Sequence, residues 1–254
     1  MAHILSLVNQ KGGVGKTTSA VNIAAALGDL GKRVLLVDAD PQGNATSGVG
    51  IRKKGIAHSI YDVVTGVCEA GEAVIETKFK NLSVIPSHIT LAGAELELAD
   101  ADRRESRIKD ALKTIEDNYD YIIIDCPPSL GLLSINALTA SSGVIIPMQC
   151  EYFALEGLTQ LLLTIKLVKK HYNSALDIVG ILITMYNGRL NLTTQVMDEL
   201  KKYYADKLFR TVVTRNVRLS EAPSFGEPIL YYDKSSKGCA AYEDIAKELT
   251  ERLD

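Results

Sequence analysis

A stretch near the amino terminus combines glycines with lysines and threonines, the residue types that hold phosphate groups. It reads KGGVGKTT at residues 11–18 and follows a short apolar run. Glycines let the backbone wrap closely around phosphate oxygens, so that its N–H groups can point at an anion. Lys16 can neutralise the β and γ phosphates, and the Thr17 hydroxyl can ligate Mg²⁺. The stretch therefore predicts a binding site for a nucleoside triphosphate.

The stretch departs in two ways from the strict phosphate-loop pattern of Gly, four residues, Gly, Lys and Ser or Thr. Gln10 stands where that pattern has its first glycine, and Lys11 is an additional lysine at the start of the loop. An apolar run before the loop and a helical pattern after it favour phosphate binding over a glycine-rich surface turn. The residues expected to surround the nucleotide are Lys11, Gly12, Gly13, Val14, Gly15, Lys16, Thr17 and Thr18.

Aspartates follow two other apolar runs, at the ends of predicted strands, where open α/β sheets hold their ligands. The run VLLV leads into Asp38 and Asp40, and the run YIII leads into Asp125. We expect Asp40 to position the attacking water and Asp125 to belong, with Thr17, to the metal shell. Asp38 is left unassigned between these roles. Each aspartate could instead cap a turn or the next helix.

The elements that must position these residues alternate along the whole chain as apolar runs and helical patterns. The interior runs are apolar at every position, which is typical of strands buried on both faces of a parallel sheet. The expected fold class is α/β, a single-domain wound, mostly parallel β-sheet with helices on both faces, of the phosphate-loop NTPase kind. The predicted strands are residues 4–8, 34–37, 82–85, 121–124, 144–147, 178–184 and 229–231, and the predicted helices are residues 15–31, 103–116, 155–171, 193–204 and 242–254.

Composition bounds the class of protein further. The 254 residues are 46% apolar and 23% charged, which is enough apolar material for one sizeable core. Because the chain shows no repeat, low-complexity tract or Pro- or Ser-rich linker, we expect one domain over residues 1–254. The net charge of −3 argues against a protein that coats nucleic acid with its whole surface, and leaves room for a local basic patch.

Cysteine spacing and hydropathy bear on the compartment. The four cysteines lie far apart, with no C-x-x-C pair, and are read as reduced thiols in a cytoplasmic protein. No signal peptide is expected, and no apolar run approaches the ~20 residues that span a bilayer.

Several longer motifs together resemble the ParA/MinD group of deviant phosphate-loop ATPases, and within it the small chromosomal ParA, or Soj-type, partition ATPases. The likeness covers essentially the whole chain, and its last two motifs are more discriminating than the loop. The motifs are KGGVGKTT at 11–18, VLLVDADPQGNATSGVG at 34–50, LAGAELEL at 91–98, YDYIIIDCPPSLGLLSINALTA at 119–140, QCEYFALEGL at 149–158 and RNVRLSEAPSFGEPI at 215–229.

The resemblance implies a mechanism built on ATP, ADP and Mg²⁺. In such proteins ATP is held between two subunits, and the signature lysine, here Lys11, reaches the partner's nucleotide. Lys16 and Thr17 hold phosphates and Mg²⁺ in their own subunit, and Asp40 matches the aspartate that promotes hydrolysis. A slow basal ATPase rate follows, because Lys11 acts only through dimer formation. Gly12 lies where the two loops face, so that a side chain there should obstruct the dimer.

The resemblance also implies partners. The ATP-bound homodimer would bind double-stranded DNA without sequence preference, be associated with the nucleoid, and be released by a ParB-type centromere-binding protein. Arg189 and Arg218 match DNA-contacting arginines, although the modest basic excess of residues 185–221 is also what a solvated surface looks like. Met185 and Asn216 match positions near the adenine base. Thr214 stands where many relatives have Pro, which leaves base stacking open.

The sequence leaves one other function open and disfavours two. A nucleotide-switched regulator of replication initiation or transcription is not separable from a segregation ATPase. An iron–sulfur redox protein that shares the lysine-bearing loop would need two cysteines per subunit, and only Cys126 has a suggestive context. A tyrosine kinase would need a tyrosine-rich tail. Larger relatives add a helical DNA-binding domain before the first strand, and membrane-cycling MinD relatives end in a basic amphipathic helix. The last predicted helix is acidic, so we expect no stable membrane binding.

Overall fold

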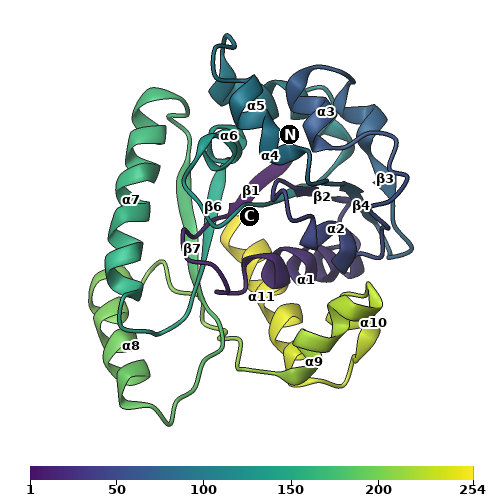
Figure 1. The fold of residues 1–254 in the computed structure, drawn as a ribbon. Helices are drawn as coiled ribbons and strands as arrows, with labels where there is room; N and C mark the ends of the chain where they lie inside the picture. Colours follow the sequence, from purple (N-terminus) through teal and green to yellow (C-terminus); the bar gives the residue numbers. More distant parts are fainter. Residues whose placement is uncertain (254) are drawn as a thin grey trace.

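A computed structural model describes residues 1–253, and their centre is one twisted sheet. The strand order is β3-β4-β2-β5-β1-β6-β7, and every neighbouring pair is parallel except β3 with β4 (Figure 1). The predicted α/β class with a mostly parallel wound sheet is confirmed. The strands are β1 (His3–Leu7), β2 (Val34–Asp38), β3 (Ile75–Glu76), β4 (Leu82–Ile85), β5 (Tyr121–Asp125), β6 (Gly143–Met148) and β7 (Asp177–Ile183).

Helices cover both faces of this sheet. The described helices are α1 (Lys16–Asp29), α2 (Asn44–Gly48), α3 (Ile60–Thr65), α4 (Leu91–Glu97), α5 (Arg107–Leu112), α6 (Leu132–Ala140), α7 (Ala154–His171), α8 (Asn191–Tyr204), α9 (Val217–Glu221), α10 (Ile229–Tyr232) and α11 (Lys237–Leu253). Helices α3 to α8 pack on one face, and α1, α2 and α9 to α11 pack on the other. None of the helices within residues 1–253 is long and apolar enough to cross a membrane.

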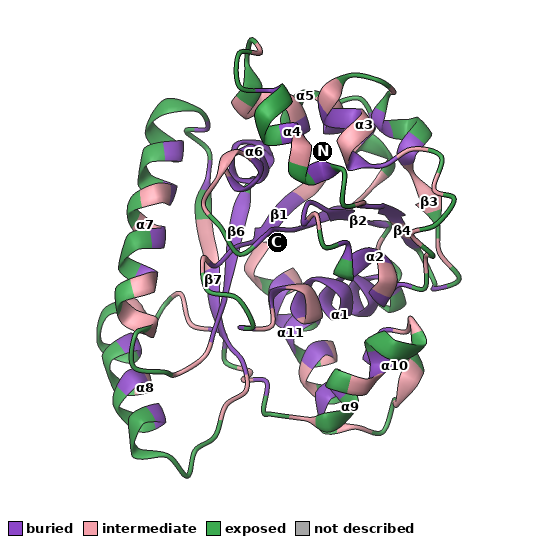
Figure 2. Ribbon diagram, in the orientation of Figure 1, coloured by how far each residue is buried: buried purple, intermediate pink, exposed green. Residues whose placement is uncertain are grey.

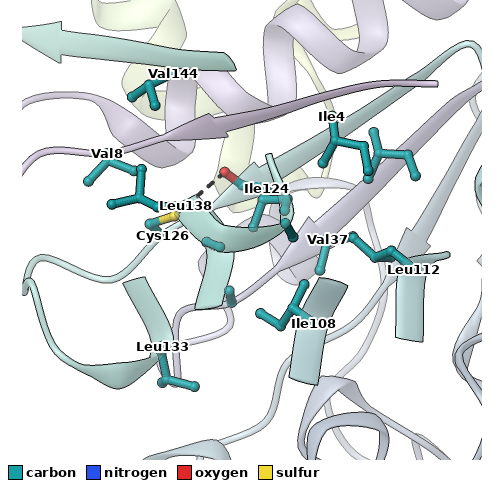
Figure 3. Close-up of a cluster of buried hydrophobic side chains, with 14 of the residues drawn as sticks. Ile4, Val8, Val37, Ile108, Leu112, Ile124, Cys126, Leu133, Leu138 and Val144 are labelled. Carbon is teal, nitrogen blue, oxygen red and sulfur yellow. Dashed lines mark hydrogen bonds between the residues drawn. The ribbon is translucent and has the colours of Figure 1, made fainter. Parts of the chain in front are cut away.

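Continuous apolar runs form the central strands because each face of the sheet needs its own apolar layer. Along β2, Leu35 and Val37 point to the α3–α8 side while Val34 and Leu36 point to the α1 side, and all four are buried. Figure 2 shows the central strands β2, β5 and β6 buried along their whole length, whereas α7 and α8 keep an exposed outer side. In the α3–α8 layer, Val37 of β2 lies with other aliphatic side chains that converge on the sheet (Figure 3).

One predicted strand is wrong. Residues 229–231 form the start of α10 rather than a strand, and the seventh strand of the sheet is β3, which was not predicted. The amides of Tyr231 and Tyr232 donate to the Pro228 carbonyl, and the Asn22 side chain accepts from the Ile229 amide at 2.7 Å. A three-residue apolar run cannot separate a strand from a buried helical turn, and here the preceding proline favours a first helical turn.

The predicted helix at 103–116 is broken in the structure. Arg103 has a left-handed φ of 53°, and a short 3₁₀ turn, Arg104–Ser106, precedes α5, which ends at Leu112. The other predicted helices are confirmed within a few residues at most of their ends. The last one, α11, begins five residues earlier than predicted and packs Ile245 and Leu249 into the core, while Asp254 lies outside the described residues.

Candidate functional site

The loop between β1 and α1 lies at the carboxyl-terminal edge of the parallel strands. Gly13 and Gly15 have φ values of 75° and 83°, which favour glycine, and Gly15 occupies the N-cap position of α1 without a side-chain cap. The first N–H groups of α1 are therefore left for an anion. A β-carbon on Gly15 would also contact Thr184 at 3.6 Å, and one on Gly12 would contact Pro128 at 3.8 Å, whereas one on Gly13 would meet no atom within 4 Å.

Side chains just after β1 and just after β7 fix the shape of this loop. The Asn9 amide group donates to the Pro147 carbonyl at 2.8 Å, and the Asn9 side-chain oxygen accepts from the Lys11 backbone N–H at 3.0 Å. On the other side, the Thr184 hydroxyl donates to the Val14 carbonyl at 2.7 Å. These hydrogen bonds order the loop, which reduces the entropic cost of binding an anion.

Gln10, which breaks the strict loop pattern, has a structural role. Its side-chain amide donates to the Gln160 side chain at 2.9 Å and lies 3.5 Å from the Gly157 carbonyl, so it contacts α7. A glycine at this position could not make that contact. No local pattern predicts this contact, since Gln160 lies 150 residues away along the chain.

Lys16, the first residue of α1, is almost fully buried inside the loop. Its Nζ donates to the Lys11 carbonyl at 3.1 Å. Burial lowers the pKa of Lys16, and the nearby Asp125, Cys126 and Asp40 oppose that shift. A buried ammonium group held against loop carbonyls is available to phosphate oxygens, because these carry more negative charge than a carbonyl does.

Asp125 ends β5 directly beside the end of β2, where Asp38 is its register partner. Its carboxylate is fully buried, and within residues 1–253 neither oxygen has a partner at hydrogen-bonding geometry. Burial raises the pKa of Asp125 well above its usual value; Asp38 and Asp40 add to that rise, and the Thr17 hydroxyl and Lys16 oppose it. A buried carboxylate that lacks partners and lies near a threonine hydroxyl fits a hydrated Mg²⁺ ion.

Asp38, which the sequence left unassigned, holds the loop that carries Asp40. One Asp38 oxygen accepts from the amide and the hydroxyl of Thr46, both at 2.7 Å, and the other accepts from the Asp40 amide at 3.2 Å. Burial raises the pKa of Asp38 to about 6. Asp40 itself is buried, and one of its oxygens accepts from the Gln42 amide at 2.9 Å; within residues 1–253 the other oxygen accepts no hydrogen bond.

A cavity of about 400 Å³ adjoins the loop on the β7 side, large enough for a nucleoside. Thr18, Met185, Thr214 and Asn216 all line it. The Asn216 side-chain oxygen caps α9 by accepting from the Arg218 amide at 2.8 Å, which leaves its NH₂ group available as a donor.

Met185 makes side-chain contacts at the edge of this cavity. It adopts a left-handed φ of 50°, and its sulfur accepts from the Gln149 side chain at 2.9 Å. The same Gln149 amide donates to the Gly13 carbonyl at 2.8 Å. Gln149, which the sequence reasoning missed as a site residue, therefore joins the phosphate loop to the nucleoside-sized cavity.

Lys11 points away from Lys16 and toward the segment between β6 and α7. Its Nζ forms an ion pair with the Glu151 carboxylate, and both side chains are about half exposed. Another cavity, of about 440 Å³, adjoins this outer side of the loop and is lined by Gln10, Lys11 and Phe153.

Comparison with known proteins identifies the family. A sequence profile of the AAA domain family matches residues 2–178. The sporulation initiation inhibitor protein Soj of Bacillus subtilis is 57% identical over 249 residues, which cover 98% of this chain and 98% of that protein. The chromosome partitioning protein ParA of Myxococcus xanthus is 51% identical over 252 residues, which cover 99% of this chain and 89% of that protein. This chain belongs to the ParA/Soj family.

The ParA/Soj chain also has close structural neighbours. Cobyrinic acid a,c-diamide synthase of Mycobacterium smegmatis, with bound ADP and magnesium, superposes with a TM-score of 0.87 at 36% identity, and the match covers 100% of this chain and 96% of that one. The family membership predicted from the six motifs is confirmed, and so is the fold that it implied.

The two arginines that the ParA/Soj resemblance links to DNA differ in their surroundings. Arg189 is exposed, and no ion pair to it is found among residues 1–253. Arg218 forms ion pairs with Glu221 at 2.9 Å and Asp233 at 3.4 Å. A phosphate group would have to compete with two carboxylates for Arg218 but with none for Arg189, so the two side chains are not equivalent.

Two disfavoured functions lose their remaining support in this ParA/Soj structure. Cys126 faces the α3–α8 layer, with Val8 and Leu138 nearby (Figure 3), and burial strongly raises its pKa. A thiol in that position cannot hold an iron–sulfur cluster at a subunit boundary. Tyr242 is buried, with its hydroxyl 3.0 Å from that of Ser19, which is a structural role rather than that of a phosphorylated tail.

Proposed function

We propose that this chain is an ATP-hydrolysing switch for chromosome or plasmid segregation, formed by one ATPase domain over residues 1–254. The observation that carries the proposal is the arrangement at the sheet edge, where Lys16, Asp40 and the unpartnered Asp125 surround one glycine-rich loop. Hydrolysis of a nucleoside triphosphate needs charge neutralisation, an oriented water and a metal ligand, and these three residues supply one each. The name of the Myxococcus relative, a chromosome partitioning protein, supports the cellular role.

ATP or ADP would lie with its phosphates on residues 11–18 and its base in the cavity lined by Met185 and Asn216. Thr17 and Asp125 would hold Mg²⁺, which neutralises charge on the β and γ phosphates when bound. Support for this comes from the free Asp125 carboxylate and from the mycobacterial structure, which contains ADP and magnesium. Lys16 stays in its own subunit and meets the phosphates from inside the loop.

Asp40 would orient the attacking water, while Lys11 would cross to the nucleotide of a second copy and stabilise the charge that develops there. Two copies would therefore form a homodimer on ATP, with each loop completing the other's site. Because a monomer lacks the second lysine, its basal hydrolysis would be slow. Rapid turnover by a monomer would contradict this mechanism.

The ATP dimer would bind double-stranded DNA without sequence preference through Arg189 and Arg218, since a dimer doubles the number of phosphate contacts. Given the two carboxylates that hold Arg218, we expect Arg189 to contribute more to DNA affinity. A ParB-type centromere-binding protein would stimulate hydrolysis and release the dimer, which places the protein on the nucleoid in the cytoplasm.

A second function is favoured by one observation, the name of the Bacillus relative, which is an inhibitor of sporulation initiation. The same ATP-controlled DNA binding could regulate replication initiation or transcription. The two functions share one biochemical switch and differ in the target that reads it.

The switch is tested by light scattering on the Asp40→Ala protein with ATP or ADP, with and without non-specific duplex DNA. We expect twice the 27.6 kDa monomer mass with ATP alone, and DNA capture only by that species. Arg189→Ala with Arg218→Ala should dimerise normally and lose DNA. A monomer with ATP, or DNA binding that ignores the nucleotide, would contradict the proposal.

A further inference from the structure

Lys11, which in the proposed function contacts the nucleotide of a second subunit, forms an ion pair with Glu151 of its own subunit. Lys11 lies in the loop after β1, and Glu151 lies 140 residues later, between β6 and α7. Their side chains are 43% and 49% exposed, so the contact is at the surface and solvent reaches it. In this arrangement the Lys11 ammonium group neutralises a carboxylate of its own chain and is not free to meet a phosphate elsewhere.

Backbone hydrogen bonds order the turn that carries this carboxylate. The Glu151 amide donates to the Gln149 carbonyl at 2.9 Å, and the Glu151 carbonyl accepts from the Ala154 amide at 3.0 Å, in the turn that leads into α7. The Gln149 side chain in turn donates to the Gly13 carbonyl. The turn that carries the carboxylate is therefore tied to the same loop that carries the lysine, so the two groups stay within reach of each other.

We propose that Glu151 is a positioning residue for Lys11, holding the lysine in its own subunit until the nucleotide of a second copy displaces the carboxylate. The inference rests on the proposed function, in which Lys11 acts across the dimer. An exposed ion pair is weak, so a triphosphate with several negative charges can outcompete a single carboxylate. In a symmetric dimer both lysines must leave, so the contact opposes dimer formation twice.

The Lys11–Glu151 ion pair should raise the dissociation constant of the ATP-bound dimer. Removing the carboxylate should tighten the ATP-bound dimer by up to about fivefold for each lysine and up to about 25-fold for the two. A fivefold change is ~1 kcal/mol, the upper end for an exposed pair, at about 1.4 kcal/mol for each tenfold. Binding of ATP to the monomer should be unchanged, because Glu151 does not line the nucleoside-sized cavity.

The chain supplies a matched control in Glu156. It is also exposed, lies five residues further along, and lines the cavity beside Lys11. No ion pair to it is found within the described part of the chain. Glu156→Gln removes the same formal charge from the same surface, so it reports any general change in repulsion between the two subunits.

The experiment compares three proteins by sedimentation velocity with ATP: Asp40→Ala alone, with Glu151→Gln, and with Glu156→Gln. We expect the Glu151 variant to dimerise between about twofold and 25-fold more tightly than the other two. Equal dissociation constants for the two glutamate variants, or a weaker dimer with Glu151→Gln, would overturn the inference. If the Asp40→Ala parent forms no dimer with ATP, the proposed function itself fails, which is a distinct result.

A second readout follows Lys11 in the nucleotide-free monomer. Acylation by an amine-reactive ester, quantified lysine by lysine by mass spectrometry, should be at least about twofold faster at Lys11 in Glu151→Gln, because the freed amine loses its carboxylate partner. Lys53, a partly exposed lysine that donates to the Gln42 carbonyl, should react at the same rate in both proteins. Unchanged Lys11 reactivity would show that the ion pair is not populated in solution and would overturn the inference.

Discussion

Glu248 on α11 is a buried carboxylate, and its replacement should lower the stability of the folded protein. Its side chain is 4% exposed and pairs with Arg252, one turn along the helix, at 2.8 Å. It also accepts from the Arg210 amide at 2.9 Å and from the Thr211 amide at 3.4 Å. The carboxylate thus anchors α11 to the segment that follows β7, which continues toward Asn216 in the nucleoside-sized cavity.

The expected cost of Glu248→Gln follows from these contacts. Glutamine has the same shape but offers one acceptor and one donor, so a side-chain NH₂ group must face N–H donors that the carboxylate now satisfies. Removing one partner of a buried ion pair costs about 3–5 kcal/mol, and because Arg252 keeps 20% exposure we expect the lower end. For a chain of this size, ~3 kcal/mol lowers the thermal midpoint by about 6–12 °C.

The assay is urea unfolding followed by circular dichroism, with thermal unfolding as a check. Asp244→Asn is the control, because Asp244 on the same helix pairs with Lys247 at 3.4 Å with both side chains more than half exposed. That pair should contribute at most about 0.5 kcal/mol. Combining Glu248→Gln with Arg252→Met should recover part of the loss, since the uncompensated charge is then gone.

A loss of less than about 1 kcal/mol in Glu248→Gln, or of no more than in Asp244→Asn, would contradict the anchoring role of this carboxylate. The full cost of Arg252→Met added to that of Glu248→Gln would contradict it too, because independent costs would mean that the two side chains do not interact. Affinity for ATP should fall together with stability, since the segment anchored by Glu248 leads into the cavity proposed for the base.

Three further predictions concern the site itself. Lys16→Ala should lower ATP affinity by roughly 30- to 150-fold, as loss of a charge-assisted hydrogen bond of ~2–3 kcal/mol implies, measured by titration calorimetry. Gly12→Val should leave the ATP affinity of the monomer within about twofold, because a β-carbon there contacts only Pro128, at 3.8 Å, and it should abolish the ATP dimer. Gly13→Val should weaken ATP binding itself, since the φ of 75° at Gly13 costs a branched residue ~1–2 kcal/mol. Asp125→Asn should raise the thermal midpoint of the nucleotide-free protein at pH 8 and remove the Mg²⁺ dependence of ATP binding.

The pH dependence of the Asp125 prediction follows from the direction of its pKa shift. The folded-state pKa is raised above the usual 3.8, chiefly by burial, so the folded protein binds the proton more tightly than the unfolded chain does. The carboxylate therefore costs stability increasingly as pH rises from about 4 through the raised pKa. The gain from Asp125→Asn should be absent near pH 4 and full above the raised pKa. A constant gain across that range would contradict the assignment of the shift to Asp125.

The predictions for Lys16→Ala and for the two glycine variants would be contradicted by different results. An unchanged ATP affinity in Lys16→Ala would mean that the buried ammonium does not meet phosphate. Equal loss of ATP binding in Gly12→Val and Gly13→Val would mean that the first position is as constrained within the monomer as the second. Sedimentation with ATP separates these effects from loss of the dimer.

The class of fold and the chemistry of the loop could be predicted from the amino-acid sequence alone. Runs such as VLLV, apolar at every position, are typical of strands covered on both faces, and a glycine-rich loop before a helix leaves backbone N–H groups for an anion. These are local signals, because a few consecutive residues carry them. Where the local run was too short, as at residues 229–231, the prediction was wrong, since packing of Ile229 beside Asn22 rather than propensity decided the element.

Which distant side chains meet at the loop could be seen in the tertiary structure but not in the sequence. Asp38 and Asp125 became neighbours because β2 pairs with β5, and Asp38 received a role only when Thr46 and Asp40 were seen to donate to it. Gln10 contacts Gln160, and Lys11 contacts Glu151, across 150 and 140 residues. Such pairs carry no periodicity and no spacing rule, because the register of the sheet, and not the chain between them, sets their distance.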